Sequence, residues 1–167
     1  MNAADKKIEI RHMILNDWEG VNRIYDNGIK TGNATFETAV PDWINWDKNH
    51  IKKCRFVAIY GDVLSGWCAL SPISTRPAYS GVAEISIYVD SNYRGKGIGS
   101  ALMGALINES EQCNIWTLQS TIFPENQASL MLHKKHGFRT VGTREKISKI
   151  NNVWHDTLLL ERRSNIF

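Results

Sequence analysis

The segment YRGKGIGSALMGALI, residues 93–107, decides the fold because it joins an expected strand to an expected helix through a loop almost free of side chains. The preceding residues 84–89, EISIYV, are rich in β-branched side chains and predict a strand. After the loop, apolar residues recur at helical spacing, which predicts a helix with one face packed on a sheet. The loop therefore lies at a strand-to-helix junction.

Three glycines, Gly95, Gly97 and Gly99, stand where this helix is expected to begin. Without side chains there, several backbone N–H groups stay uncovered and converge with the positive end of the helix dipole. A polyphosphate fits such a place. Taken alone, a Gly-x-Gly-x-Gly turn is equally compatible with a tight connection that binds nothing, so the rest of the chain has to decide.

Composition limits the classes of protein to consider. A length of 167 residues suits a single domain, residues 1–167, with a hydrophobic fraction of 43% and a charged fraction of 22% that are ordinary for a globular protein. The 20 Lys and Arg residues against 17 Asp and Glu favour an anionic ligand without indicating nucleic acid. The N-terminus lacks the apolar core of a signal segment, and no run approaches the roughly 18 apolar residues of a membrane span. We expect a cytoplasmic protein that binds neither nucleic acid nor membranes.

The cysteines and histidines show no metal-binding pattern. Cys54, Cys68 and Cys113 are dispersed, with no Cys-x-x-Cys pair, and are interpreted as buried thiols in a reducing compartment. Four histidines are interpreted as structural or surface residues: His12, His50, His136 and His155. For His155, the alternative interpretation is that it lines the site. No metal is expected.

Hydrophobic periodicity along the chain predicts the element order βααβββαβαββ. Strands are expected at 7–13, 55–60, 64–70, 82–89, 114–122, 138–146 and 153–161. One helix is expected at about 17–30 and a second begins at residue 41. A third runs from the glycine loop to about residue 112, and a fourth covers 124–135. The strand at 114–122 follows a helix, so it should lie parallel to 82–89 through a right-handed crossover. This order predicts an α+β fold on a mixed sheet, without linkers or repeats.

A second motif lies downstream, where Asn126, Ser129, His133 and Gly137 follow the spacing N-x-x-S-x-x-x-H-x-x-x-G-F. Together with the strand and the RGKGIG loop at 94–99, this pattern resembles the GNAT family of N-acetyltransferases over nearly the whole chain. More narrowly, the chain resembles the phosphinothricin and methionine sulfoximine acetyltransferase group, through TFE at 35–37, EISIYV at 84–89, LH at 132–133 and WHD at 154–156. The resemblance implies the GNAT fold, with a mixed central sheet flanked by helices, acetyl-CoA as co-substrate, and a homodimer.

The resemblance also implies a cofactor site. The glycine-loop main chain would cradle the pyrophosphate of acetyl-CoA, and the main chain of 87–89 would hold the pantetheine arm where the central strands splay. A main-chain N–H near Val89 would meet the developing oxyanion. Lys134, Lys135 and Arg139 are possible partners of the CoA 3′-phosphate, although a solvated basic face is the preferred interpretation. The expected cofactor-binding residues are Ile87, Tyr88, Val89, Arg94, Gly95, Lys96, Gly97, Ile98, Gly99, Ser100, Asn126 and Ser129.

Two residues are candidates for proton transfer. Glu84, at the start of the apolar strand, is the expected general base, directly or through water; the alternative is a salt-bridge partner at a strand end. His133 shares a helix face with Asn126 and Ser129. Many family members have a tyrosine here, so a histidine changes the chemistry: it can protonate the CoA thiolate or relay a proton from the amine. The alternative is a packed helix histidine.

A third set of residues is expected to form the acceptor pocket. Arg76 offers a bidentate fork for a substrate carboxylate, and the alternative is an exposed loop arginine. Phe36 and Tyr79 are expected to wall the pocket, Glu37 to meet an ammonium group, and Ser86 to join Glu84 at the substrate.

A free α-amino group has a pKa of about 8 against about 10.4 for lysine, and so loses its proton more easily. The expected reaction is acetyl transfer from acetyl-CoA to a small amino-acid-like compound of the phosphinothricin, methionine sulfoximine or methionine sulfone type, by direct attack. Two alternatives stay open. One is acetylation of a protein N-terminus, lysine or polyamine, and the other is a non-catalytic acetyl-CoA sensor.

Overall fold

The computed structural model describes residues 7–167, and its elements follow the predicted order βααβββαβαββ. The expectation that the N-terminus carries no signal segment falls largely on residues 1–6 and lies outside the described residues. The elements are β1 (Ile8–His12), α1 (Trp18–Lys30), α2 (Trp43–Asn49), β2 (Phe56–Tyr60), β3 (Val63–Pro72), β4 (Val82–Val89), α3 (Ile98–Gln112), β5 (Thr117–Ile122), α4 (Gln127–Lys135), β6 (Arg139–Ile150) and β7 (Val153–Arg163). Short 3-10 turns lie at Leu15–Asp17, Pro77–Tyr79 and Ser91–Tyr93.

The strands form one seven-stranded sheet in the order β1-β2-β3-β4-β5-β7-β6. Every neighbouring pair is antiparallel except β4 and β5, which are parallel. The prediction that β5 lies parallel to β4 is confirmed. The helix α3 makes the connection between these two strands, so the glycine loop at its start lies at the end of β4.

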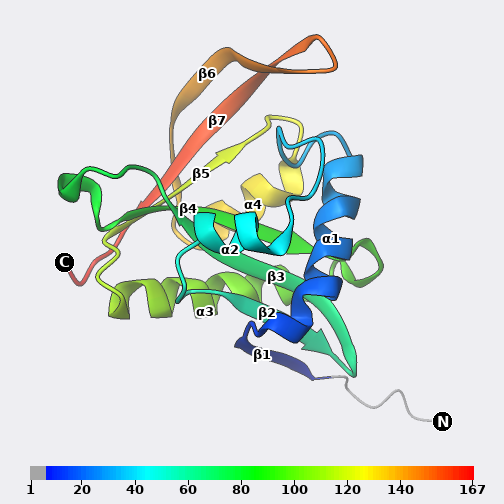
Figure 1. Cartoon of the computed structure of the whole chain (residues 1–167). Coiled ribbons are helices and arrows are strands. Elements are labelled where there is room, and N and C mark those ends of the chain that lie inside the picture. Colours follow the sequence, from blue (N-terminus) through cyan, green and yellow to red (C-terminus); the bar gives the residue numbers. More distant parts are fainter. Residues whose placement is uncertain (1–6) are drawn as a thin grey trace.

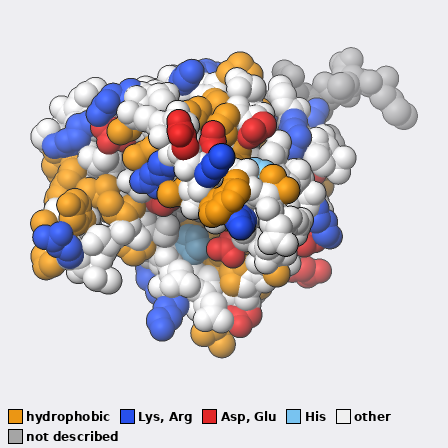
Figure 2. All heavy atoms as spheres, turned by 90° about the horizontal axis from the view of Figure 1, so that it is seen from above, with side chains coloured by type: hydrophobic (Ala, Val, Ile, Leu, Met, Phe, Trp, Pro, Cys, Tyr) orange, Lys and Arg blue, Asp and Glu red, His pale blue; other side chains and the backbone are white. Residues whose placement is uncertain are grey.

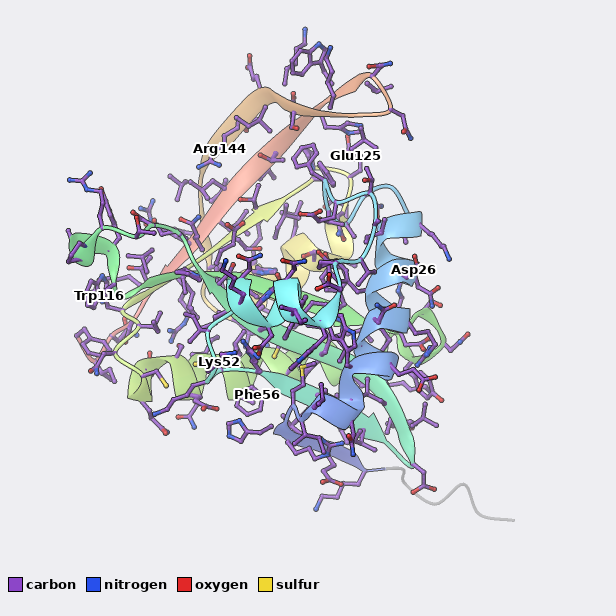
Figure 3. All side chains as sticks on the ribbon, viewed as in Figure 1. Asp26, Lys52, Phe56, Trp116, Glu125 and Arg144 are labelled. Atoms are coloured by element: carbon purple, nitrogen blue, oxygen red, sulfur yellow. The ribbon has the colours of Figure 1, made fainter. Side chains whose placement is uncertain are left out.

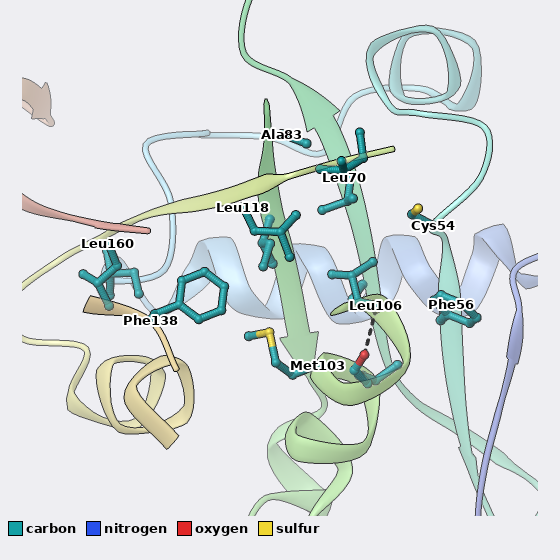
Figure 4. Packing of buried hydrophobic residues seen from close by; sticks show 14 of the residues in the cluster. Cys54, Phe56, Leu70, Ala83, Met103, Leu106, Leu118, Phe138 and Leu160 are labelled. Carbon is teal, nitrogen blue, oxygen red and sulfur yellow. Dashed lines mark hydrogen bonds between the residues drawn. The ribbon is translucent and has the colours of Figure 1, made fainter. Parts of the chain in front are cut away.

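Helices cover both faces of the sheet (Figure 1). Side chains of β2 alternate between the faces: Phe56 and Ala58 belong to the cluster that α3 and α4 cover, whereas Val57 belongs to the cluster under α1 and α2. The larger cluster contains the fully buried Leu102 and Leu106 of α3 and is shown in Figure 4. Because helices cover both faces, β2 is apolar along its whole length.

The central sheet separates between β4 and β5. Their pairing covers only Val82–Glu84 of β4, although β4 continues to Val89 against β3 and β5 continues to Ile122 against β7. From Ile85 onward, β4 therefore has no ladder partner on its β5 side. The splay that the family resemblance implied is present, and it leaves main-chain polar groups of β4 for another partner.

Two segments project from this body (Figure 1). The β6–β7 hairpin extends beyond the rest of the sheet, and β6 is exposed along most of its length. The loop between β3 and β4, which carries Arg76, projects from the side of the molecule away from α1. Within residues 7–167, no helix combines the length and hydropathy that crossing a membrane requires.

The three cysteines are free thiols. Cys54 and Cys68 are fully buried, as predicted, whereas Cys113 is only partly buried because it caps the end of α3.

Candidate active site

A cavity of about 1250 Å³ opens where β4 and β5 separate. Its walls come from the end of α1 and the loop to residue 37, from β4, from the glycine loop, from the end of β5 with α4, and from β6 and β7. Seen from above, the molecule is hollowed near its centre, with charged side chains of both signs around the hollow (Figure 2). Small-ligand pockets usually measure about 300–1,000 Å³, so this cavity has room for a long ligand together with a second, smaller one.

The glycine loop has the geometry of an anion cradle. Gly95 and Gly97 have φ angles of 75° and 83°, which side chains disfavour, and Gly97 is the N-cap of α3 without any side-chain cap. The first main-chain bond of α3 runs from the Ala101 N–H to the Gly97 carbonyl, so the preceding N–H groups lack helical partners. A Cβ on Gly99 would lie 3.2 Å from Leu132, which explains the third glycine by close packing.

The start of α3 is tied to the end of α4. The Ser100 hydroxyl lies 2.8 Å from Nε2 of His136, and burial lowers the pKa of that imidazole. Ser100 lines the cavity as predicted. Lys96 does not: its ammonium group lies 5.3 Å from the ring centroid of Tyr60, on the β2 side of the loop.

The free edge of β4 forms the long wall of the cavity, with Ile87, Tyr88 and Val89 all in the lining. The Tyr88 ring is held against α1, where a Cβ on Gly28 would come within 2.6 Å of it, and it stacks on Trp67 with ring centroids 4.9 Å apart. Burial raises the pKa of Tyr88, so its hydroxyl stays protonated. Packed side chains thus fix the strand whose main chain faces the cavity.

Glu84 stands at the point of separation, as the last residue of β4 that pairs with β5. Its side chain is half-buried and lines the cavity. The ion pairs formed within residues 7–167 do not include it. The alternative of a strand-end salt bridge therefore finds no partner in the described chain, and the carboxylate is uncommitted.

His133 is fully buried in the wall formed by α4. Its Nδ1 lies 2.8 Å from the main-chain oxygen of Ser129, and since a carbonyl can only accept, Nδ1 carries the proton. Burial lowers the pKa of His133, which keeps the ring neutral. Its Nε2 is buried without a hydrogen-bond partner in the described chain, so the lone pair of this nitrogen is unused.

Asn126 has an evident structural role. Its side-chain oxygen accepts from the Ser129 N–H at 3.2 Å, which caps α4, and its amide nitrogen lies 3.3 Å from the Asn33 carbonyl. Both Asn126 and Ser129 line the cavity, as predicted, and together they join α4 to the loop after α1.

The predicted acceptor residues divide into two groups. Phe36 and Glu37 line the cavity, and the Phe36 ring contacts Phe123 edge to face at 4.8 Å. Arg76 and Tyr79 do not line it: the guanidinium of Arg76 lies 5.6 Å from the Tyr79 ring, on the exposed loop before β4. Within one chain, the fold does not bring these two residues to Glu84.

Residues that sequence reasoning did not assign complete the wall. Arg144 of β6, labelled in Figure 3, is a cationic residue of the lining, and Thr157 of β7 has a buried hydroxyl without a partner in the described chain. Of the three basic residues considered for the CoA 3′-phosphate, only Lys135 lines the cavity. The other unassigned lining residues include Thr31, Asn33, Ser120, Thr121, Phe123, Glu125, Leu132, Ile147 and Ser148.

Comparison with known proteins agrees with this geometry. The family model described as the acetyltransferase (GNAT) family matches residues 18–138. The chain is 32% identical to YwnH of Bacillus subtilis (strain 168), provisionally named a phosphinothricin acetyltransferase, with 87% of this chain and 93% of that protein covered. It is 30% identical to the L-amino acid N-acetyltransferase AaaT of Escherichia coli (strain K12), covering 93% of this chain and 98% of that one.

A solved structure makes the same point. The phosphinothricin acetyltransferase of Sinorhizobium meliloti, in complex with AcCoA, superposes with a TM-score of 0.85 at 25% identity, covering 93% of this chain and 88% of that one. The chain belongs to the GNAT acetyltransferase family, and the fold is the GNAT fold. The protein is an acetyl-CoA-dependent N-acetyltransferase.

Proposed function

We propose that the protein acetylates the α-amino group of a small amino-acid-like compound of the phosphinothricin, methionine sulfoximine or methionine sulfone type. The observation that carries this proposal is the convergence on one cavity of a glycine-loop anion cradle, the uncommitted carboxylate of Glu84 and the unpaired Nε2 of His133. The names of YwnH, AaaT and the Sinorhizobium enzyme support the amino-acid class of acceptor.

The residues present fit acetyl-CoA. The uncapped N–H groups at the start of α3 would bind the pyrophosphate, and the free edge of β4 at Ile87–Val89 would bind the pantetheine arm. When bound, acetyl-CoA supplies an activated acetyl thioester. The open main-chain groups near Val89 would orient it and stabilise negative charge on its carbonyl oxygen.

Glu84 and His133 would handle the protons. The carboxylate of Glu84 takes a proton from the acceptor ammonium group, directly or through a water, so that the neutral amine can form the new C–N bond. Since Nδ1 of His133 is committed to the Ser129 carbonyl, Nε2 begins as a proton acceptor. It can return a proton to the sulfur of the breaking C–S bond only after receiving one, so we propose a relay role for His133.

Recognition of the acceptor would involve both sides of the cavity. Phe36 with Phe123 would form an apolar wall, Glu37 would face the ammonium group, and Ser86 lies along β4 beyond Glu84. Arg144 is the basic residue that β6 contributes to the lining and is suited to a substrate carboxylate. The predicted role of Arg76 as a carboxylate partner stays a prediction, since its loop lies outside the cavity of a single chain.

The test is acetyl-CoA-dependent thiol release with phosphinothricin, methionine sulfoximine, methionine sulfone, a peptide and a polyamine as acceptors. We expect turnover with the amino-acid analogues, and Glu84→Gln should lower kcat by on the order of 10²–10⁴-fold while acetyl-CoA still binds. The matched control is Glu145→Gln, an exposed carboxylate on β6, which should keep full activity.

Three results would contradict the proposal. Turnover with peptide or polyamine alone would replace the acceptor class. Acetyl-CoA binding without turnover on any acceptor would favour a sensor. Equal activity of Glu84→Gln and wild type would remove Glu84 as the base.

We also propose a homodimer that works in a reducing cytoplasm. Support for the dimer comes from the β6–β7 hairpin, which exposes the large apolar residues Val141, Ile147, Val153 and Trp154. The three free thiols agree with a reducing compartment. Sedimentation of wild type and Trp154→Glu should give a dimer and a monomer respectively, and a monomeric wild type would refute the assembly.

A further inference from the structure

A second cluster of reactive side chains lies at the C-terminal end of α3, away from the glycine loop at its start. Cys54, Glu109 and Cys113 each offer a ligand atom there, and the two sulfurs and a carboxylate oxygen all lie within 4.8 Å of one another. The cavity described above contains none of the three. At about 1.5 Å of rise per residue, α3 separates this cluster from the glycine loop by roughly 20 Å.

The fold holds Cys54 firmly. It precedes β2, as Figure 4 shows, and is fully buried with a φ of 58°, an uncommon conformation for a residue with a side chain. The next residue, Arg55, is anchored by Asp47 at 2.6 Å and by the Ile51 carbonyl at 2.7 Å. A conformation of this kind persists only where the surroundings enforce it.

The carboxylate also has a partner. Nε2 of His12, on β1, lies 3.4 Å from a carboxylate oxygen of Glu109, whose side chain is 17% exposed. An imidazole that orients a ligating carboxylate from outside is a recurrent feature of metal sites. Four residues from β1, the segment before β2 and α3 thus meet at one point.

The cluster brings two thiol groups and one carboxylate to one place, and each of these groups can bind a cation. Within the described chain, the ion pair that Glu109 forms is with His12 alone, and His12 is largely exposed. A cation placed between the three ligand atoms would be held from two separate segments of the chain.

We propose that Cys54, Glu109 and Cys113 bind a divalent zinc ion. Thiolate ligands select zinc among the available divalent cations, and mixed sulfur and oxygen ligands are compatible with its tetrahedral geometry. With Zn–S near 2.3 Å, tetrahedral ligand atoms lie about 3.8 Å apart, so the present spacing needs to close by about 1 Å at most. Binding releases the two thiol protons to solvent, and a water completes the fourth position.

This zinc site would stabilise the fold and take no part in acetyl transfer. It would join the end of α3 to β1 and to the entry of β2. The sequence predicts no metal because Cys54 lies far along the chain from Glu109 and Cys113, so the three ligands do not form a known motif.

The experiment uses the full chain, reduced and freed of metal with a chelator. Zinc is titrated in competition with a chromophoric chelator, and cobalt is substituted to detect thiolate-to-metal charge-transfer absorption. We expect one equivalent per chain and a rise in Tm with zinc. Cys113→Ser should abolish the charge-transfer band of a two-thiolate site, and His12→Asn should weaken zinc binding by about 10–100-fold.

Cys68→Ser is the matched control, since Cys68 is equally buried but lies outside the cluster, with its sulfur 3.7 Å from the Leu102 carbonyl. It should bind zinc as wild type does. Three results would overturn the proposal: no zinc uptake by the reduced wild-type chain, equal loss in Cys68→Ser and Cys113→Ser, or a Cys54–Cys113 disulfide as the form isolated under non-reducing conditions with no metal. Because zinc content is measured directly, none of these depends on the acceptor substrate.

Discussion

Two histidines end two helices in nearly the same local chemistry. At the end of α4, Nδ1 of His133 lies 2.8 Å from the carbonyl of Ser129, and at the end of α2, Nδ1 of His50 lies 2.7 Å from the carbonyl of Trp46. Each bond reaches back four residues, and burial lowers the pKa of both rings. Both imidazoles are therefore neutral near pH 7, with the proton on Nδ1.

Their other faces differ. His50 stacks on Trp46 with ring centroids 4.1 Å apart, and its main-chain oxygen accepts from Arg55 at 2.6 Å. His133 meets the edge of Phe138, lines the cavity, and has a buried Nε2 without a hydrogen-bond partner in the described chain. The helix-end bond thus sets the tautomer and burial keeps each ring neutral, while the surroundings of Nε2 decide whether the ring packs or reacts.

The largest expected effect separates the two histidines by activity. His133→Ala should lower kcat by about 100-fold because the proton relay is lost, whereas His50→Ala should leave kcat within about twofold. Steady-state kinetics with saturating acetyl-CoA and acceptor measures both. Equal losses in the two variants would mean that His133 acts through stability alone.

The second effect concerns stability, and here the change at His50 is the informative one. His50→Ala should lower the free energy of unfolding by about 2 kcal/mol, because it removes the stacking on Trp46 and loosens the end of α2 that anchors Arg55. Urea denaturation gives the value. An unchanged midpoint would show that the α2 histidine is dispensable to packing.

The third effect is a pH dependence that both histidines share. Their folded pKa values lie below the unfolded value of about 6.5, so the unfolded chain binds more protons as the pH falls below 6.5. Stability is thus complete above that pH and is lost below it, by at most about 1.4 kcal/mol per pH unit for each histidine.

Urea unfolding between pH 5 and 7 tests this dependence. The double variant His50→Gln/His133→Gln should flatten the slope, with His136 supplying what remains because burial lowers its pKa too. A slope identical to that of wild type would contradict the assignment of neutral buried rings.

The smallest effect tests which atom of Ser129 orients His133. The hydroxyl oxygen lies 3.4 Å from Nδ1, against 2.8 Å for the main-chain oxygen. Ser129→Ala keeps the main-chain partner, so kcat should change by less than about threefold. A loss comparable to that of His133→Ala would assign the orienting role to the hydroxyl.

Sequence reasoning predicted the fold well because the signals are local. The apolar run of β2, the β-branched residues of β4 and the glycines of the loop each depend on residues close together in the chain. The parallel pairing of β4 and β5 followed from the helix between them.

The site was predicted less completely because its walls come from distant segments. Arg144 and Thr157 carry no motif, and only the packing of the β6–β7 hairpin beside β5 brings them to the cavity. Arg76 shows the converse: it carries suitable chemistry, but the loop before β4 directs it away from the cavity of its own chain. The cysteine and glutamate cluster was missed for the same reason of sequence distance.

The splay between β4 and β5 has a consequence for how such an enzyme changes under selection. The donor side of the cavity is formed chiefly by main-chain groups of the glycine loop and the free edge of β4, which substitution hardly alters. The acceptor side is formed by side chains from several separate elements, each replaceable one at a time. The enzyme can therefore gain new acceptors while its acetyl-CoA binding stays unchanged. An inhibitor that occupies the donor side contacts the surface that substitutions alter least.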